Sequence, residues 1–180
     1  YGENHTEKEG TVHDYLGMTF DYSFTDEVRI NMQQYISKVI KEFPAAITSK
    51  CATPATDNLY KIREDGKKLD EKQADTFHHT VYQLLFAANR ARRDIQTAVS
   101  FLTTRVKAPD EDDWNKLVRV LCYLNGTRYL KLILSADSMN FSIHWYIDAS
   151  HQVHEDCRGQ IGSLMTFGKG AVTSSSNKMK

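Results

Sequence analysis

The chain has 180 residues, of which 41% are hydrophobic, and its 23 Lys and Arg residues balance its 23 Asp and Glu residues. This length and hydrophobic share are enough for one moderate core or two small ones, which excludes a disordered tail. The balanced charge argues against nucleic-acid binding by bulk charge alone, so local clusters of basic side chains must supply any such binding.

The sequence predicts neither a membrane span nor a disulfide framework. No apolar run approaches the roughly 18 residues needed to cross a bilayer, and no secretory leader pattern opens the sequence. We therefore expect an intracellular protein, cytoplasmic or nuclear, with no membrane partner. The cysteines Cys51, Cys122 and Cys157 are scattered and form no C-x-x-C pair, which argues against disulfides and against a cysteine zinc site.

The first third of the chain predicts a β-hairpin and then a short helix. Apolar residues alternate over residues 15–22 and again over 28–32, the pattern of paired strands with one buried face. They then recur at helical spacing up to Phe43, where Pro44 ends the helix. Residues 45–75 are polar and contain turn-forming residues, so we expect a long connection there.

The middle of the chain predicts three helices. The apolar faces of the first two lie within residues 77–88 and 95–106. The third follows Pro109; acidic residues 110–113 precede it and fill its first turn, where the helix dipole favours negative charge, and Gly126 is expected to cap it. Its buried stripe is predicted to consist of Trp114, Leu117, Val118, Leu121 and Cys122.

After Gly126 the apolar pattern changes from helical spacing to alternation, which predicts a new subdomain of short antiparallel strands. A turn is expected at Asp137 and Ser138. No helix is expected to cover this sheet, so it would be incomplete by itself. The fold class is therefore α+β, with a hairpin, a helical subdomain and a partial antiparallel sheet. The predicted strands of that sheet lie within Leu130–Leu134, Phe141–Ile147, Ile161–Phe167 and Ala171–Ser175.

Asp148 is the first candidate for chemistry. It ends an apolar strand and shares a strand face with His144 and Tyr146. A carboxylate held by a rigid strand suits Mg²⁺, which prefers oxygen ligands. The alternative interpretation is an ordinary aspartate that begins a turn after the strand.

Two further groups of polar residues have competing interpretations. His151, His154 and Cys157 form an H-x-x-H-x-x-C pattern that fits a zinc site lacking one ligand, or else a polar loop. The basic residues near the second helix are either a phosphate-binding cluster or a solvated helix surface. This cluster consists of Arg90, Arg92, Arg93, Arg105 and Lys107.

Several motifs in order resemble the polyproteins of copia-type retrotransposons. The resemblance begins with a tyrosine-leucine-glycine hairpin and a thumb pattern of Tyr-Ile, Phe and Thr-Pro. It continues with segments similar to the patterns RPDI…AV, RVLRYLKGT and VDAS, and with a closing hairpin, and it covers residues 11–180. The matching segments are His13–Met18, Tyr35–Ile36, Phe43, Thr53–Pro54, Arg92–Val99, Val118–Thr127, Ile147–Ser150, Gly168–Val172 and Ser174–Lys180.

The resemblance implies a fragment of a reverse transcriptase and ribonuclease H. It implies a palm-end primer-grip hairpin at residues 1–32, a helical thumb and connection at 33–127, and an incomplete ribonuclease H-like domain at 128–180. The primer grip would be Tyr15, Leu16 and Gly17, and Asp148 would be the first carboxylate of a two-Mg²⁺ ribonuclease H site. The implied partner is a template-primer duplex or an RNA–DNA hybrid.

The same resemblance implies that the polymerase aspartates and the other ribonuclease H carboxylates belong to flanking segments. We therefore expect the parent to be the enzyme and this fragment alone to be inactive, without firmly bound Mg²⁺. The sequence also departs from the family: Arg93 stands where proline is usual, and Asn125 replaces a more basic residue. The competing hypothesis is a non-catalytic structural or interaction module with a protein partner.

Overall fold

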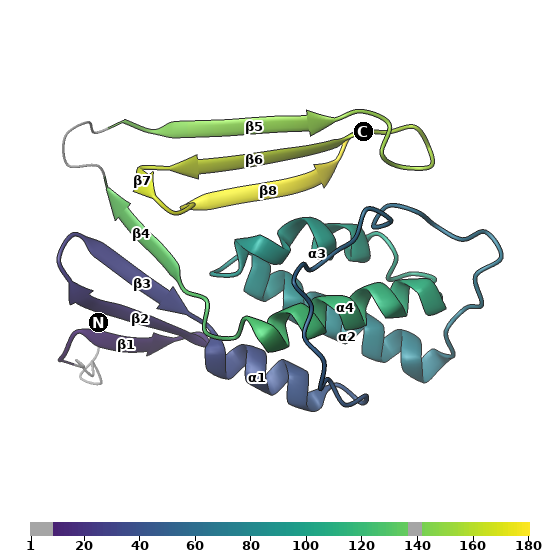
Figure 1. Ribbon diagram of the computed structural model, residues 1–180, viewed down its shortest axis with the longest axis horizontal. Helices are drawn as coiled ribbons and strands as arrows, with labels where there is room; N and C mark the ends of the chain where they lie inside the picture. Colours follow the sequence, from purple (N-terminus) through teal and green to yellow (C-terminus); the bar gives the residue numbers. More distant parts are fainter. Residues whose placement is uncertain (1–8, 137–141) are drawn as a thin grey trace, which may run out of the picture.

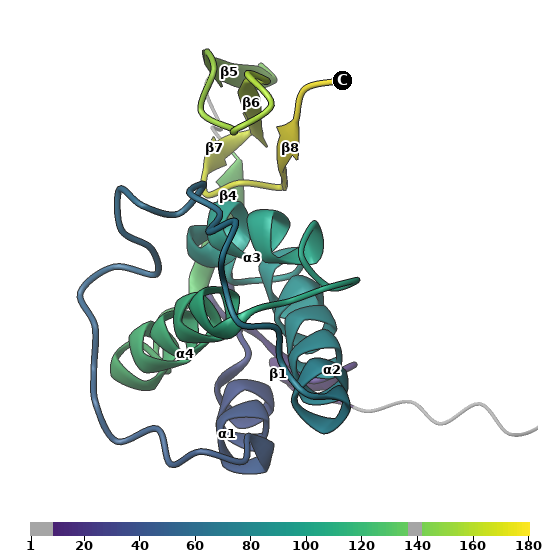
Figure 2. The same ribbon diagram turned by 90° about the vertical axis from the view of Figure 1, so that its right-hand side faces the viewer.

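The computed structural model describes residues 9–136 and 142–180, and it has the predicted α+β class. Helices form the body of the molecule, one sheet lies beside them, and a second sheet lies across α3 (Figures 1 and 2). No described helix is both long and apolar enough to cross a membrane. The helices are α1 (Gln33–Glu42), α2 (Glu71–Ala88), the 3-10 turn η1 (Arg93–Ile95), α3 (Gln96–Thr103) and α4 (Glu111–Gly126).

The first sheet is antiparallel and has the strand order β1-β2-β3-β4-β7. The predicted hairpin, β2 and β3, is therefore part of a larger sheet, in which β2 also pairs with β1 and β3 also pairs with β4. Its strands are β1 (Val12–Tyr15), β2 (Met18–Phe24), β3 (Glu27–Asn31), β4 (Leu132–Ala136) and β7 (Gly168–Lys169).

Strand β4 differs from the sequence prediction. It was expected to open the C-terminal sheet, but it pairs with β3, where Ile30 lies opposite Leu132 and Val28 opposite Leu134. These four apolar side chains belong to or pack against the main core, so β4 adds its buried face to the nearest open strand edge. The predicted turn at 137–138, and Phe141 at the start of the next predicted strand, lie outside the described residues.

The second sheet contains β5 (His144–Ser150), β6 (Gln160–Thr166) and β8 (Thr173–Lys178), antiparallel and in that order. The sequence predicted no helix against this sheet, but three side chains of η1 and α3 donate to carbonyls of β8 and of Val172 just before it. The donor side chains are about one helical turn apart, about 5.4 Å, and the accepting carbonyls are two strand residues apart, about 6.8 Å. The two spacings are similar enough for successive bonds to form. The bonds are Arg93 Nη2 to Val172 O (3.2 Å), Gln96 Nε2 to Ser174 O (2.9 Å) and Ser100 Oγ to Ser176 O (2.5 Å).

Helices α3 and α4 begin and end close to the predicted positions, whereas α2 begins at Glu71, inside the segment that was predicted to be a connection. Asp70 caps α2 by accepting a 2.8 Å hydrogen bond from Gln73 N. Asp110 and Asp113 form a capping box at the start of α4, while Gly126 is the last helical residue and Thr127, not Gly126, is the C-cap. The fully buried core side chains include Phe77, Val81, Ile95, Val99, Leu102, Leu117 and Leu121.

The long connection predicted for residues 45–75 ends at Asp70, because residues 71–75 already belong to α2. Its first part is hydrogen-bonded to α4, and we call residues 47–62 the strap (Figure 1). Arg119 Nη2 donates to Thr53 Oγ1 at 3.0 Å, and Asn125 Nδ2 donates to the carbonyls of Ile47 (3.2 Å) and Ser49 (3.1 Å). Asn125 therefore fastens the strap to the end of α4, which gives this departure from the family pattern a structural role.

Trp114 is only partly buried, whereas the sequence placed it in the buried stripe of α4. Its ring packs against Phe43 with 5.0 Å between centroids, and the fully buried residues of the helix lie on the neighbouring stripe of Leu117, Leu121 and Leu124. We expect Trp114→Ala to lower the free energy of unfolding by about 1–3 kcal/mol, less than the 3–5 kcal/mol typical of a fully buried indole. Urea denaturation measures this, and a change under about 0.5 kcal/mol would contradict the packing.

Candidate nucleic-acid interface and carboxylate site

The tyrosine-leucine-glycine motif forms the tight turn between β1 and β2. Tyr15 pairs with Met18, so Leu16 and Gly17 make a two-residue loop, and both have positive φ angles of 49° and 75°. Two positive φ angles are the geometry of the hairpin turn that matches strand twist, and they are unusual for leucine. Tyr15 and Leu16 are 63% and 58% exposed, so this turn presents two apolar side chains to solvent.

The absence of a side chain at Gly17 lets this turn approach Tyr35 of α1 closely. A Cβ atom at Gly17 would lie 3.2 Å from Cδ2 of Tyr35, tighter than ordinary contact, and the backbone already has a left-handed φ. Tyr35 is itself held by a 3.1 Å hydrogen bond from its hydroxyl to Gln83 O and by the Phe86 ring. The predicted primer-grip residues thus lie on a rigid turn anchored to α1 and α2.

Asp148 lies near the end of β5 and is exposed. It is opposite Gly162 of β6, and Gly162 is opposite Ser176 of β8, so no side chain of β6 covers the sheet beside the carboxylate. One of its oxygens accepts a 2.9 Å hydrogen bond from Ala149 N. The remaining acceptor positions of the carboxylate face solvent or the groove described next.

A groove of about 720 Å³ lies between the start of α3 and the second sheet. Arg93, Gln96 and Thr97 line it from the helix side, and β5 contributes Asp148. The sequence interpretation included Arg93 and Asp148 but missed the serines of β8. The only sequence signal for them is the run Thr173-Ser174-Ser175-Ser176, which is too polar for a strand with a buried face. The remaining lining residues are Trp145, Tyr146, Ile147, Gly162, Ser163, Leu164, Ser174, Ser175 and Ser176.

Arg93 is the cation of this groove. Besides its bond to Val172 O, its Nη1 lies 3.5 Å from Ala88 O, and its Nε is buried without a hydrogen-bond partner among the described atoms. Burial, together with the nearby charge of Arg90, lowers the pKa of the Arg93 guanidinium. A desolvated guanidinium with an unused donor is suited to an anionic ligand oxygen.

The residues of this groove do not complete a Mg²⁺ site. Within residues 9–136 and 142–180, no three His, Cys, Asp or Glu side chains converge on one point. A metal clamp for phosphodiester chemistry needs several carboxylates, and Asp148 is one.

Arg92 was predicted to contact phosphate, but the structure buries it at 1% exposure. Its guanidinium forms a fork with Asp94, with Nη2 to Oδ2 at 2.6 Å and Nε to Oδ1 at 2.9 Å, and it donates to Thr127 O and Oγ1 at 3.1 and 2.8 Å. Tyr123 also donates to Asp94, at 2.8 Å. Arg92 therefore joins η1 to the end of α4, and its burial leaves its guanidinium out of reach of nucleic acid.

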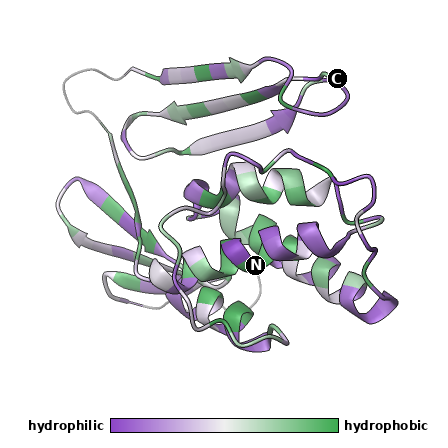
Figure 3. Ribbon diagram, turned by 45° about the vertical axis from the view of Figure 1, so that its right-hand side comes forward, coloured by the Kyte–Doolittle hydropathy of each residue, from purple (hydrophilic) through white to green (hydrophobic). Residues whose placement is uncertain are grey.

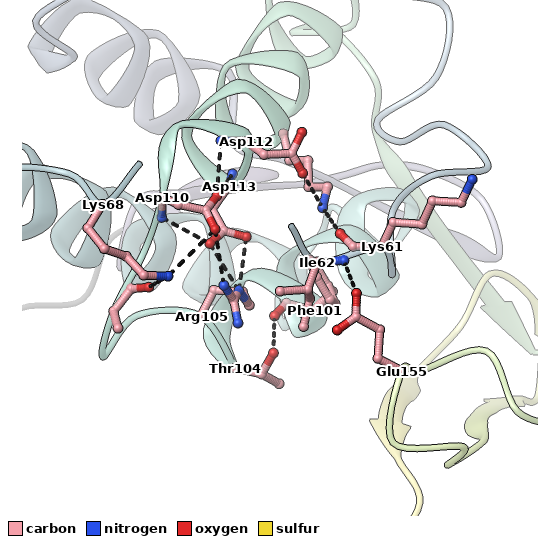
Figure 4. A network of polar contacts seen from close by, with 12 residues as sticks. Lys61, Ile62, Lys68, Phe101, Thr104, Arg105, Asp110, Asp112, Asp113 and Glu155 are labelled. Carbon is pink, nitrogen blue, oxygen red and sulfur yellow. Dashed lines mark hydrogen bonds and ion pairs between the residues drawn. The ribbon is translucent and has the colours of Figure 1, made fainter. Parts of the chain in front are cut away.

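Arg105 is also bound within the protein (Figure 4). Its Nε lies 3.0 Å from Asp113 Oδ2 and its Nη2 lies 3.4 Å from Asp110 Oδ2, and both carboxylates are almost fully buried. Lys68 adds a second cation 3.7 Å from Asp110. The acidic run at the start of α4 is thus a helix cap neutralised by Arg105 and the connection before α2.

Burial and charge have opposite effects on these two carboxylates. Burial raises the pKa of Asp113, and the Asp110 amide and Arg105 only partly offset that. Burial also acts to raise the pKa of Asp110, but two amide hydrogen bonds, Lys68 and Arg105 together hold it below its ordinary value.

Two residues of the predicted basic cluster remain fully at the surface. Arg90 and Lys107 are exposed at the ends of the segment that contains α3, and the Arg90 guanidinium lies 4.8 Å from the centre of the Phe86 ring. The structure therefore does not bring the five basic residues together. Arg90 and Arg93 lie near the groove, Arg92 and Arg105 are used internally, and Lys107 lies beyond α3.

The proposed zinc pattern has a different use in the structure. His154 is buried, its Nε2 lies 2.9 Å from Gln160 Oε1, and its ring packs edge-on against Tyr60 at 4.7 Å. Next to it, Glu155 accepts a 2.6 Å hydrogen bond from Ile62 N (Figure 4). This loop therefore attaches the strap to the second sheet.

The chain is similar to a curated protein of a yeast transposon. The chain is 31% identical over 172 residues to a Saccharomyces cerevisiae protein named as the transposon Ty5-1 protein YCL074W. The alignment includes 95% of this chain but only 55% of that protein, so the chain spans about half of its relative. No family model and no solved structure matches. The similarity supports a retrotransposon-derived protein.

Proposed function

We propose that the chain is a fragment of the RNA-directed DNA polymerase and ribonuclease H region of a copia-type retrotransposon. It would contribute part of the surface for a template-primer duplex and one carboxylate of a ribonuclease H site. The observation that carries this proposal is the groove lined by both Asp148 and Arg93, a carboxylate from the sheet and a cation from the helical body. The similarity to a transposon protein along nearly the whole chain supports it.

Each proposed segment has a physical role in this scheme. In the proposed primer-grip segment, residues 1–32, Tyr15 and Leu16 of the β1–β2 turn would contact the primer end, because an exposed aromatic on a tight turn can stack on a base or sugar. Residues 33–127 would be the thumb and connection. Residues 128–180 would be the start of the ribonuclease H domain, with β4 passing back to the first sheet.

Asp148 would be a Mg²⁺ ligand only together with carboxylates from other parts of a parent protein. We propose that this chain binds the backbone of an RNA–DNA hybrid in the groove, and that only a parent protein catalyses its cleavage. Binding is therefore the property to measure.

We expect weak, salt-sensitive and sequence-independent binding to an RNA–DNA hybrid. If Arg90, Arg93 and Lys107 contact phosphates, log K should fall with log[salt] at a slope of about −2 to −3, since each contact contributes about 0.9. Replacing Arg90 and Arg93 together by Gln should flatten the slope by roughly 2. Fluorescence anisotropy of a labelled hybrid, starting at about 50 mM salt, measures both quantities.

A matched control separates this site from the loss of charge alone. Lys38 and Lys41 are exposed on α1, and their double replacement by Gln removes the same charge elsewhere. The control should leave the slope unchanged within about 0.5. No binding at about 50 mM salt, or equal slopes in the two double variants, would reject the proposed interface.

The second candidate is a non-catalytic interaction module of retrotransposon origin. The observation in its favour is that Arg92 and Arg105 are bound within the protein, which removes two of the five basic residues from any phosphate surface. Rejection of hybrid binding would favour this candidate.

A further inference from the structure

Strand β5 has a free edge. It is the first strand in the order β5-β6-β8, and none of the described residues pairs with its outer side. It lies on the outside of the second sheet, away from the helical body (Figures 1 and 2). The unpaired amide and carbonyl groups along such an edge are a template for another strand.

The strand lacks the features that normally protect an edge. All seven of its residues are exposed, and the register with β6 runs from His144 to Ser150 without a bulge. No Pro, Lys or Arg interrupts it. Its hydropathy is mixed (Figure 3), and the three large side chains at its centre, Trp145, Tyr146 and Ile147, are 56%, 61% and 66% exposed. Edges with these properties tend to pair with another chain.

The sequence of this strand is complementary to itself when it is reversed. In an antiparallel pair of two copies centred on Tyr146, His144 of one copy lies opposite Asp148 of the other, and Trp145 lies opposite Ile147. The flanking residues match as well, with Ile143 opposite Ala149 and Ser142 opposite Ser150. Aromatic with β-branched pairs and opposite-charge pairs are the cross-strand contacts that stabilise sheets.

Other registers lose these matches. With the centre at Trp145, Asp148 would lie opposite Ser142 and His144 opposite Tyr146. With the centre at Ile147, Asp148 would lie opposite Tyr146 and His144 opposite Ser150. The self-complementarity is therefore specific to one register.

We propose that two copies of this chain associate through β5, antiparallel and centred on Tyr146, to form a continuous six-stranded sheet. The same strand serves both copies, so the contact is closed by a two-fold axis and does not propagate. The net charge of zero gives the copies no overall repulsion. This proposal does not depend on hybrid binding, and either can fail without the other.

Sedimentation velocity of the full chain tests the association. We expect a reversible shift from the 20.6 kDa monomer to twice that mass as concentration rises, with a dissociation constant on the order of 10–100 μM for so small an interface. Ile147→Lys should raise this constant at least tenfold, because the ammonium would lie opposite Trp145. Ile161→Lys is the matched control, an exposed isoleucine on the same sheet face but on the central strand.

Cysteine cross-linking tests the register, with Cys157→Ser as background because Cys157 is the exposed native thiol. Opposed residues in antiparallel strands have Cα atoms about 4.5–5.5 Å apart, within disulfide range. Tyr146→Cys should therefore cross-link to itself on mild oxidation. Trp145→Cys should not, but should cross-link when mixed with Ile147→Cys.

Three results would overturn the proposal. The first is a monomer at every concentration, which would leave this edge to a different partner. The second is an equal effect of Ile161→Lys and Ile147→Lys, which would indicate association through the sheet face. The third is self-cross-linking at residue 145 as efficient as at 146, which would exclude the proposed register.

Discussion

Replacing Arg92 by Ala is expected to lower the free energy of unfolding by about 2–4 kcal/mol, although the residue belongs to a run that looks like a surface cluster. The guanidinium is 1% exposed and satisfies Asp94 and both oxygens of Thr127. Its loss would leave the Thr127 carbonyl without this donor and Asp94 with only the Tyr123 hydroxyl. Asp94 is 30% exposed and can be partly rehydrated, which places the expected cost below that of a fully buried pair.

Urea denaturation at pH 7 measures this change, and the chain offers two informative companions. Arg90→Ala, two residues away and exposed, should change stability by less than about 0.5 kcal/mol. Arg92→Lys should lower the free energy of unfolding nearly as much as Arg92→Ala, because an ammonium group cannot form both the two-pronged contact with Asp94 and the hydrogen bonds to Thr127. Equal stability of the Arg90 and Arg92 variants would show that Arg92 is not the link between η1 and α4.

The sequence predicted those elements that local signals determine. Helical spacing located α2, α3 and α4, and Asp110 and Pro44 marked helix ends because capping and ring geometry act within one turn. These signals depend on neighbours in the chain and not on the tertiary fold. The cap at Asp70 was missed, since it lies in a polar stretch that was predicted to be a connection. The Leu16-Gly17 turn was not located by the alternation, which placed both residues inside one strand; only the family resemblance implied a hairpin there.

Features that depend on distant contacts were not predicted. Alternation in β4 gave a strand but could not say that its partner is β3. The predicted stripe of α4 is buried at Leu117, Leu121 and Cys122, but Trp114 lies at its margin and is only partly buried against Phe43. The position of Phe43, at the end of α1, is a distant contact that helical spacing in α4 does not reveal.

The candidate site shows the same limit. Asp148 and Arg93 were each identified, but only the packing of α3 against β8 places them in one groove. The basic cluster was overestimated because charge counting does not show which arginine meets a buried carboxylate. Asp94 lies two residues from Arg92 and Asp113 eight from Arg105, and both spacings are also common on solvated surfaces.

Replacing Arg105 by Ala is the second large effect we expect, a loss of about 3 kcal/mol in the free energy of unfolding at pH 7. Arg105 neutralises Asp110 and Asp113, whose side chains are 1% and 2% exposed, and only Lys68 would remain near them. Two like charges would then share a buried site at the start of α4. Lys107→Ala, an exposed neighbour, should change stability by less than about 0.5 kcal/mol.

The loss in Arg105→Ala should shrink as the pH falls toward about 4, the ordinary pKa range of aspartate. Burial already raises the pKa of Asp113, and removing Arg105 raises it further and weakens the lowering at Asp110. A carboxyl group with a higher pKa in the folded state than in the unfolded state stabilises the fold at pH values below its unfolded-state pKa. This stabilisation is lost as the pH rises through the folded-state pKa. The free energy of unfolding of the variant should therefore fall progressively further below that of the parent chain between about pH 4 and pH 7. Denaturation across this range measures the difference, and a loss independent of pH would mean that Arg105 acts through the packing of its stem and not through its charge.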